Sequence, residues 1–381
     1  IDEVGSATIA ATTITVASNT SGTIDIAYFN SDSIDINDGH ALLAIDLNQG
    51  VSTFSYTATA GNITATAVDT AAKSLTITAG SGTVALVNLD TTTGNVAITA
   101  TGDITLTSDT AVTTTSGNID IDSSAGKILT TAASNTTADL LTAGGTITLE
   151  ASTGIADSGS AGLDIDSGSG AVTLVRDGTG LVNVDYSSTD GDAVTLTITA
   201  GGAGNIEYDS EATGTLTLGA ITFTGSGSLT ISNQATIAVG AVINTTVGAT
   251  DDLTITAGGT GDITLADVNN ILTTGGGAVT LDASGDDITV AEANGDNGVE
   301  ILGSGTITLT ANVIGASGNH LDLDDATALV LSDTGAGVIF IDEVGSATIA
   351  ATTITVASNT SGTIDIAYFN SDSIDINDGH A

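Results

Sequence analysis

The sequence predicts an all-β protein, an elongated parallel β-solenoid with no helical domain. Three observations lead to this fold class. Apolar residues alternate with polar ones along short segments, turn residues separate these segments about every eight to twelve residues, and Pro is absent from all 381 residues. Alternation with a period of two is typical of strands with one buried face. The absence of Pro fits an uninterrupted hydrogen-bonded ladder, because Pro cannot donate to one.

The alternating segments begin near the first residues and continue to the end. Ile, Val and Leu take the inward positions, and Thr or Asp stand between them. The clearest pairs are Ile14/Val16, Ile24/Ile26, Ile34/Ile36, Ile45/Leu47, Leu75/Ile77, Val84/Leu86, Val96/Ile98, Ile104/Leu106, Ile119/Ile121, Ile147/Leu149, Leu163/Ile165, Val172/Leu174, Val194/Leu196, Leu216/Leu218, Leu229/Ile231, Leu253/Ile255, Ile263/Leu265, Val279/Leu281, Ile288/Val290, Ile307/Leu309, Leu321/Leu323 and Leu329/Leu331.

Glycine punctuates the segments in a recurring motif. Gly followed by Asn or Asp and then an apolar residue occurs at Gly61, Gly94, Gly102, Gly117, Gly204 and Gly261. Gly adopts a positive φ without steric cost, and Asn or Asp tolerates it next best, so each motif predicts a tight corner. Coils of about 20 to 30 residues would then stack about 4.8 Å apart.

One segment is repeated without a single substitution. Residues 1–41 recur as residues 341–381, at an offset of 340. We therefore interpret residues 1–340 as one full period of a continuous solenoid and residues 341–381 as the start of the next identical period. Repetition on this scale is typical of arrays and solenoids. The chain is expected to be a stretch of a longer tandem array, in which further copies stack end to end.

A tandem array of immunoglobulin-like β-sandwiches is the alternative fold. Such domains usually contain a core Trp, a Cys pair or a corner Tyr. Trp and Cys are absent here, and the five Tyr residues show no regular placement. The two folds differ in strand pairing, which is parallel in the solenoid and mostly antiparallel in the sandwich.

The net charge is -42, with Lys73, Lys127 and Arg176 as the only Lys or Arg residues. Nucleic acid and anionic lipid both require a basic surface, so neither is an expected partner. No apolar run approaches the roughly 18 residues of a membrane span.

Lyases that act on acidic sugars need basic residues, and three scattered cations argue against an enzyme. Adjacent acids such as Asp251-Asp252, Asp286-Asp287 and Asp324-Asp325 are interpreted as solvated turns, because neighbours on a strand point to opposite faces. His40 and His320 are interpreted as ordinary turn or surface residues.

Segments such as GNVAITATGDITLTSDTAVTTTSGNIDIDSSAG, at residues 94–126, and AGGTITLEASTG, at residues 143–154, resemble filamentous-haemagglutinin-type repeats. That family comprises giant secreted bacterial adhesins with right-handed β-helical shafts. The resemblance implies a right-handed β-helix, a bacterial origin and a cell-surface location.

Calcium is the expected ligand, if there is one. Both carboxylates of an Asp-x-Asp pair face outward on a strand, about 6 to 7 Å apart. Calcium takes six to eight oxygen ligands, so each pair would need help from a neighbouring coil. Asp35, Asn37 and Asp38 are expected to gather at a turn. The full candidate set is Asp35, Asn37, Asp38, Asp120, Asp122, Asp164, Asp166, Asp322, Asp324 and Asp325.

The expected function is therefore structural: an extracellular fibre or adhesin shaft that mediates surface attachment or filament formation. Its partners would be further copies of the repeat, end to end or side by side, and a cell or surface target. The alternative function, tied to the sandwich fold, is a calcium-dependent tether.

Overall fold

The computed structural model describes residues 12–16, 22–27, 33–38, 41–48, 53–70, 72–132, 137–156, 162–188, 190–245, 248, 250–266, 271–291, 299–303, 305–335, 337–344, 351–356, 363–367 and 374–378. For residues 12–48, 351–356 and 366–378 this description covers the backbone alone. The chain forms two compact units, residues 1–188 and residues 189–381. Every regular element in the described ranges is a strand. These ranges therefore contain no helix long and apolar enough to cross a membrane.

The first unit contains strands β1 to β19. Their bounds are β1 Thr12–Val16, β2 Gly22–Ala27, β3 Ser33–Asp38, β4 Ala41–Asn48, β5 Thr53–Ala58, β6 Gly61–Asp69, β7 Leu75–Ala79, β8 Val84–Leu86, β9 Leu89–Thr91, β10 Val96–Ala100, β11 Ile104–Leu106, β12 Val112–Thr114, β13 Ile119–Ser123, β14 Ile128–Thr130, β15 Leu140–Thr142, β16 Ile147–Ala151, β17 Leu163–Asp166, β18 Val172–Arg176 and β19 Val182–Tyr186.

The second unit contains strands β20 to β37. Their bounds are β20 Val194–Ala200, β21 Ile206–Ser210, β22 Leu216–Phe223, β23 Leu229–Asn233, β24 Ile237–Val239, β25 Ile243–Thr245, β26 Leu253–Ala257, β27 Ile263–Ala266, β28 Leu272–Thr274, β29 Val279–Ala291, β30 Ile301–Gly303, β31 Thr306–Ile314, β32 Leu321–Asp324, β33 Ala328–Asp333, β34 Ile339–Glu343, β35 Ala351–Val356, β36 Ile364–Ala367 and β37 Ile374–Asp378.

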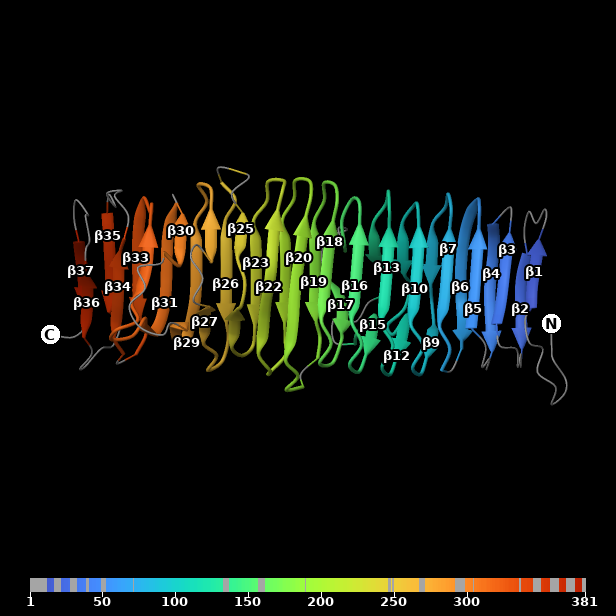
Figure 1. The fold of residues 1–381 in the computed structure, drawn as a ribbon, viewed down its shortest axis with the longest axis horizontal. Coiled ribbons are helices and arrows are strands. Elements are labelled where there is room, and N and C mark those ends of the chain that lie inside the picture. Colours follow the sequence, from blue (N-terminus) through green and yellow to red (C-terminus); the bar gives the residue numbers. More distant parts are fainter. Residues whose placement is uncertain are drawn as a thin grey trace. The chain divides into compact units, whose positions relative to one another are not determined.

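Parallel ladders run through each unit, as Figure 1 shows. In the first unit, β1, β3, β5, β7, β10, β13, β16 and β18 pair in that order, and every pair is parallel. In the second, β21, β23, β26, β29, β31, β33, β35 and β37 do the same. The predicted all-β parallel solenoid is confirmed, and the antiparallel sandwich alternative is wrong.

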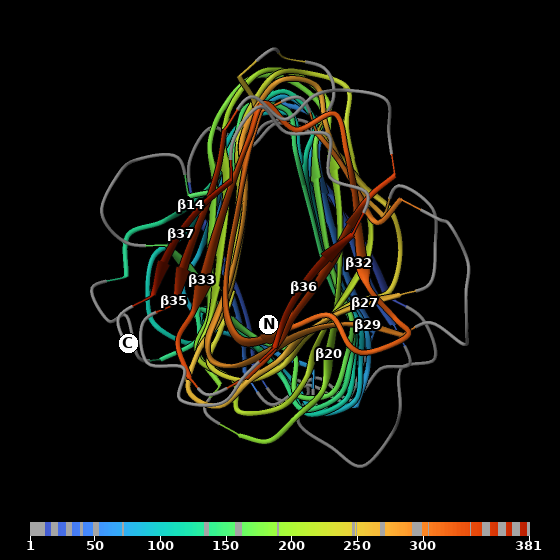
Figure 2. The same cartoon turned by 90° about the vertical axis from the view of Figure 1, so that its left-hand side faces the viewer.

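The length of a coil varies within narrow limits. Register partners lie as few as 20 residues apart, as at Leu321 and Ile341, and as many as 29 apart, as at Leu272 and Ile301. The predicted range of 20 to 30 residues is confirmed. In Figure 2 the strands of the first unit, in blue to green, follow the same outline from coil to coil.

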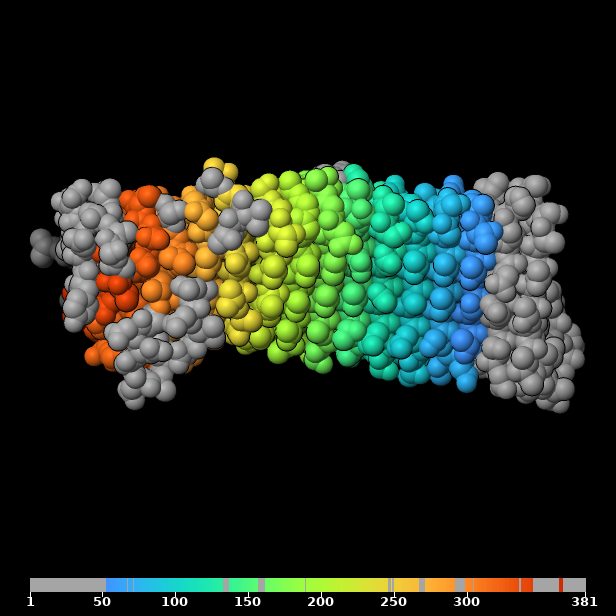
Figure 3. All heavy atoms as spheres, turned by 45° about the horizontal axis from the view of Figure 1, so that its top comes forward, coloured from blue at the N-terminus to red at the C-terminus, as the bar shows by residue number. Residues whose placement is uncertain are grey.

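The core is a set of inward rows, one row for each inward strand position. On β10 the burial alternates strictly, with Val96, Ile98 and Ala100 buried and the residues between them partly exposed. Each buried residue stacks on its register partners, so Leu75, Val96 and Ile119 form one continuous row. Burying a Val, Leu or Ile side chain stabilises the fold by about 1.5–3 kcal/mol, so even a thin core accumulates stability coil by coil. In Figure 3 successive coils of the first unit, coloured blue to green, form adjoining bands on the surface.

Stacked glycines make the corners possible. A Cβ added at Gly117 would lie 1.9 Å from the carbonyl oxygen of Gly94, and one at Gly145 would lie 2.0 Å from that of Gly117. Non-bonded heavy atoms cannot approach so closely. The recurring Gly of the sequence motif is therefore required by the close approach of neighbouring coils.

Threonine hydroxyl groups buried at these corners form hydrogen bonds with backbone groups there. Thr142 Oγ1 donates to the carbonyl oxygen of Gly117 in the preceding coil, at 3.0 Å, and accepts from the Gly145 amide, at 3.0 Å. Thr114 does the same with Gly94 and Gly117. Buried backbone groups need such partners, because an unmade hydrogen bond is costly away from water.

The Asn or Asp after each glycine joins one coil to the next. Asn95 Oδ1 accepts from the Asn118 amide at 3.0 Å, and Asn118 Oδ1 accepts from the Thr146 amide at 3.0 Å. Asp103 Oδ1 accepts from the Lys127 amide at 2.9 Å. The observed role of this side chain is therefore an inter-coil hydrogen bond.

The repeated segment forms the same strand pair in both copies. In the first copy β1 pairs with β3, Thr12 opposite Ile34. In the second copy β35 pairs with β37, Thr352 opposite Ile374. β35 also pairs with β33, Leu329 opposite Thr352. Within its own unit, the second copy thus continues the ladder of the residues before it.

Candidate functional site

Stacking brings together carboxylates that are distant in the sequence. Asp120 and Asp122 lie on β13 on its outward side, as predicted, with Ile121 buried between them. The next coil places Glu150 of β16 in register with Asp122. Parallel strands lie about 4.8 Å apart, so the two acids form a like-charged column.

Burial and the neighbouring charges raise the pKa values of Glu150 and Asp122 in this column. Burial, then the charges of Asp122 and Asp177, and then a hydrogen bond with Asp177 raise the pKa of Glu150. Burial, followed by the charges of Asp120 and Asp177, also raises the pKa of Asp122. Asp177 follows β18, one coil further along. The sequence analysis missed Glu150 and Asp177, because finding them requires the coil lengths that set the register.

In each of the other two predicted pairs, one acid is buried. On β17, Asp164 is buried and Asp166 is partly exposed. On β32, Asp322 is buried and Asp324 is partly exposed. Asp164 and Asp322 alternate with the inward Leu and Ile residues as predicted, but each is buried and not open to solvent.

Asp166 and Asp322 take part in local hydrogen bonds. Asp166 Oδ1 accepts from the Gly168 amide at 2.8 Å, which closes a turn. The Asp322 amide donates to Glu300 Oε2 at 2.7 Å, and Glu300 is itself buried. Asp325 follows β32 in the left-handed region, with φ of 64°. Asp325 is exposed at the corner, as expected for a solvated acidic turn, whereas Asp324 ends β32 and its Oδ1 atom is buried.

Asp35, Asn37 and Asp38 lie within strand β3, in register with Ser55, Thr57 and Ala58. The predicted turn at these residues is wrong, since the strand continues to Asp38. Their side chains lie outside the described part of the molecule.

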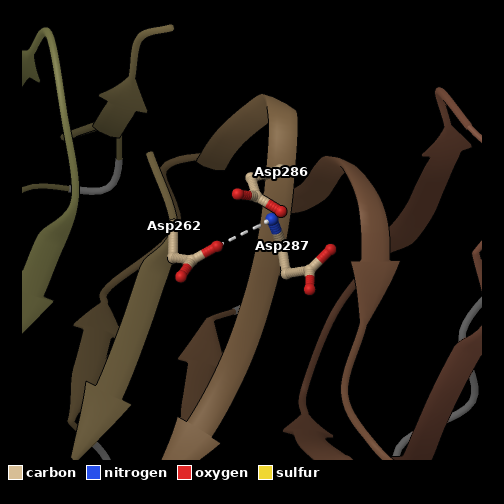
Figure 4. A group of neighbouring side chains, drawn as sticks. All are labelled: Asp262, Asp286 and Asp287. Atoms are coloured by element: carbon tan, nitrogen blue, oxygen red, sulfur yellow. Dashed lines mark hydrogen bonds between the residues drawn. The ribbon is translucent and has the colours of Figure 1, made fainter. Parts of the chain in front are cut away.

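One group of three acids among the described residues was not predicted. Asp262, Asp286 and Asp287 each offer a carboxylate oxygen, and these atoms lie within 4.8 Å of one another. Figure 4 shows them at a corner shared by two coils. The Asp287 amide donates to Asp262 Oδ1 at 3.2 Å, and Asn312 Nδ2 donates to Asp287 Oδ1 at 3.3 Å. Burial, offset in part by the Asn312 hydrogen bond and reinforced by the charges of Asp286 and Asp262, raises the pKa of Asp287.

A distortion of β29 explains why sequence reasoning missed this group. Asp286 and Asp287 were interpreted as a solvated turn, because adjacent residues on a regular strand point to opposite faces. The register between β29 and β31 shifts between Ala283 and Asp287, which marks an irregular corner. Three carboxylate oxygens lie close together here. Ca²⁺ takes six to eight oxygen ligands, so these three could supply part of a calcium site.

His320 has a specific partner rather than the plain surface position expected of it. Its Nδ1 lies 2.7 Å from Asp342 Oδ1, and its ring lies 5.4 Å from the ring of Phe340, centroid to centroid. Asp342 belongs to the second copy of the repeated segment. This contact therefore joins the last residues of one sequence period to the first residues of the next.

No family model, curated protein or solved structure matches the chain. The functional conclusion therefore depends on the fold, the repeat and the charge.

Proposed function

We propose that the chain is a segment of a non-enzymatic structural shaft, part of an extracellular fibre or surface adhesin built from tandem copies of the 340-residue period. The observation that carries the proposal is the pairing of β33 with β35. The ladder passes from the end of the first period into the repeated segment by ordinary parallel pairing. Stacking can continue in this way for as many periods as the gene encodes.

The charge supports a solvated rod. Six of the 45 acids lie in residues 341–381, which leaves 39 acids against three cations, a net charge of -36, in one period. Mutual repulsion along a rod keeps it extended and soluble and opposes side-by-side packing. It also makes acidic or nucleic-acid partners unfavourable, so partners would be further copies of the repeat and a cell or surface target.

A bacterial cell-surface location is the part of the proposal that rests on the resemblance to filamentous-haemagglutinin-type repeats. The fold class, a parallel solenoid, is the one that this resemblance implies. Calcium is proposed as a stabilising ion, because the stacked carboxylates at Asp122 and Glu150 repel one another and a divalent cation would relieve that repulsion.

Electron microscopy of chains with one, two and three periods tests the proposal. At about 4.8 Å per coil, each added period should lengthen the particle by roughly 55 to 80 Å while its width stays constant. Chains that form rows of separate beads, or particles whose width grows with the number of periods, would contradict the shaft.

A further inference from the structure

In the second unit, glycines of successive coils stack in a column, and one position of this column is occupied by a buried acid. Ile206, Leu229, Leu253, Val279 and Ile307 are successive register partners in β21, β23, β26, β29 and β31, so the residues two places before them align as well. Four of these residues are Gly204, Gly227, Gly277 and Gly305, and the fifth is Asp251. A Cβ at Gly227 would lie 2.0 Å from the carbonyl oxygen of Gly204, and one at Gly277 would lie 2.0 Å from that of Asp251. The column therefore excludes side chains at these glycines, and Asp251 breaks its pattern.

The Asp251 side chain is enclosed. The residue is 4% exposed, and its Oδ2 atom has no hydrogen-bond partner in the described structure. A Cβ at Gly248 would lie 2.3 Å from Oδ2 and 2.4 Å from Oδ1, so the glycine leaves room for the carboxylate. A buried carboxylate without a partner is unfavourable unless a donor or a cation approaches it.

A hollow of about 360 Å³ lies at the same place. Its lining consists of Ala203, Gly204, Asn205, Ser226, Gly227, Ser228, Thr250 and Asp251. These residues offer hydroxyl groups, backbone groups and one carboxylate, and none of them carries a positive charge. The Asn205 and Ser228 side chains already accept from backbone amides, at 3.1 Å from Ser228 and 3.2 Å from Asp252, which fixes two walls of the hollow.

We propose that this hollow is a calcium site, with the Asp251 carboxylate as its charged ligand. The lining is made of hard oxygen donors, which Ca²⁺ prefers, and it is irregular. Mg²⁺ demands near-ideal octahedral geometry and gives up water reluctantly, whereas Ca²⁺ accepts six to eight ligands in flexible arrangements. Hydroxyls of Ser226 and Thr250, together with water, would complete the shell. The inference depends on this hollow alone, so the length measurements on the shaft can succeed or fail independently of it.

The test compares calcium binding by the full chain and three variants, using calorimetry and thermal melting at constant ionic strength. Asp251→Asn removes the charge and keeps the shape. Asp251→Gly restores the glycine found at the other four positions, so it should fold even if the first variant does not. Asp252→Asn is the matched control, because Asp252 is exposed and its Oδ1 accepts from the Ala278 amide at 2.8 Å, a bond that Asn can keep.

The wild type and Asp252→Asn should bind Ca²⁺ with equal affinity, while both Asp251 variants lose about tenfold or more in affinity. Mg²⁺ at the same concentration should not raise the melting temperature as Ca²⁺ does. Equal calcium binding by all four proteins would overturn the proposal and point to other acids, such as Asp262 and its neighbours. An absence of calcium binding by the wild type, or an equal response to Mg²⁺, would overturn it as well.

Discussion

Glu150 stands in register with Asp122 on the neighbouring coil, so two carboxylates of like charge are stacked on the outer face of the first unit. The pKa of each is raised, in both cases first by burial and then by the surrounding acids. The solenoid therefore tolerates local repulsion that a parallel ladder imposes whenever acids fall at matching positions.

Removing this repulsion should stabilise the protein. Glu150→Gln is expected to raise the free energy of unfolding at neutral pH by about 0.2–1 kcal/mol, the usual range for a cross-strand pair. Urea unfolding at pH 7.5 measures the change. Glu207→Gln is the control, because Glu207 lies on β21 in register with Thr230 of β23. An equal gain in both variants would show that overall charge, and not the stacked pair, is responsible.

Asp139 should make the first unit more stable in mild acid than at neutral pH. Its side chain is buried, and this burial raises the pKa of Asp139 from its ordinary value of 3.8 to about 6. The folded protein therefore holds the proton more tightly than the unfolded chain. The resulting stabilisation is complete below about pH 4 and is lost as the pH rises through about 6.

Asp139→Asn removes this dependence. At pH 7.5 the variant should be more stable than the wild type by about 1–3 kcal/mol, and at pH 3.5 the two should be similar. Melting curves across this pH range provide the measurement. A variant that is less stable than the wild type at pH 7.5 would mean that the ionised carboxylate is favourable in the fold.

The glycine corners should be intolerant of even one carbon atom. Gly117→Ala places a Cβ 1.9 Å from the Gly94 carbonyl oxygen, so the coils must separate locally. The expected loss is about 1–3 kcal/mol, as for other overpacked sites. At Gly191 nothing lies within 4 Å of an added Cβ, and Gly191→Ala should be nearly neutral. Denaturant unfolding of the two variants measures the difference. Equal shifts in their denaturant midpoints would contradict this account.

The fold could be predicted from the sequence because its strands obey a period of two with few exceptions. Asp120 and Asp122 face outward as expected, since β13 is a regular five-residue strand. Of the six glycines in the Gly-Asn and Gly-Asp motifs, Gly61 and Gly204 have the predicted positive φ, and the other four do not. Their inter-coil role could not be predicted, because it depends on which residue lies above which.

The carboxylate sites could be predicted only in part, for two physical reasons. Coil length varies from 20 to 29 residues, so the partner of Asp122 cannot be found by counting. The alternation along a strand also does not predict which outward residues become buried or where a strand becomes irregular. Asp164 is buried on a short strand, and the irregular corner of β29 brings Asp286 and Asp287 together.

The central claim is that the repeated segment stacks on the period before it in parallel register, and one cross-linking measurement tests it most directly. Val330 and Thr353 are register partners in β33 and β35, and the chain has no Cys of its own. Partners about 4.8 Å apart lie within the range of Cα separations that a disulfide accepts. The double variant Val330→Cys with Thr353→Cys should therefore oxidise rapidly within one chain. Val330→Cys with Thr355→Cys, two residues out of register, should not. Equal oxidation of the two double variants, or none in the first, would contradict the stacking of successive periods.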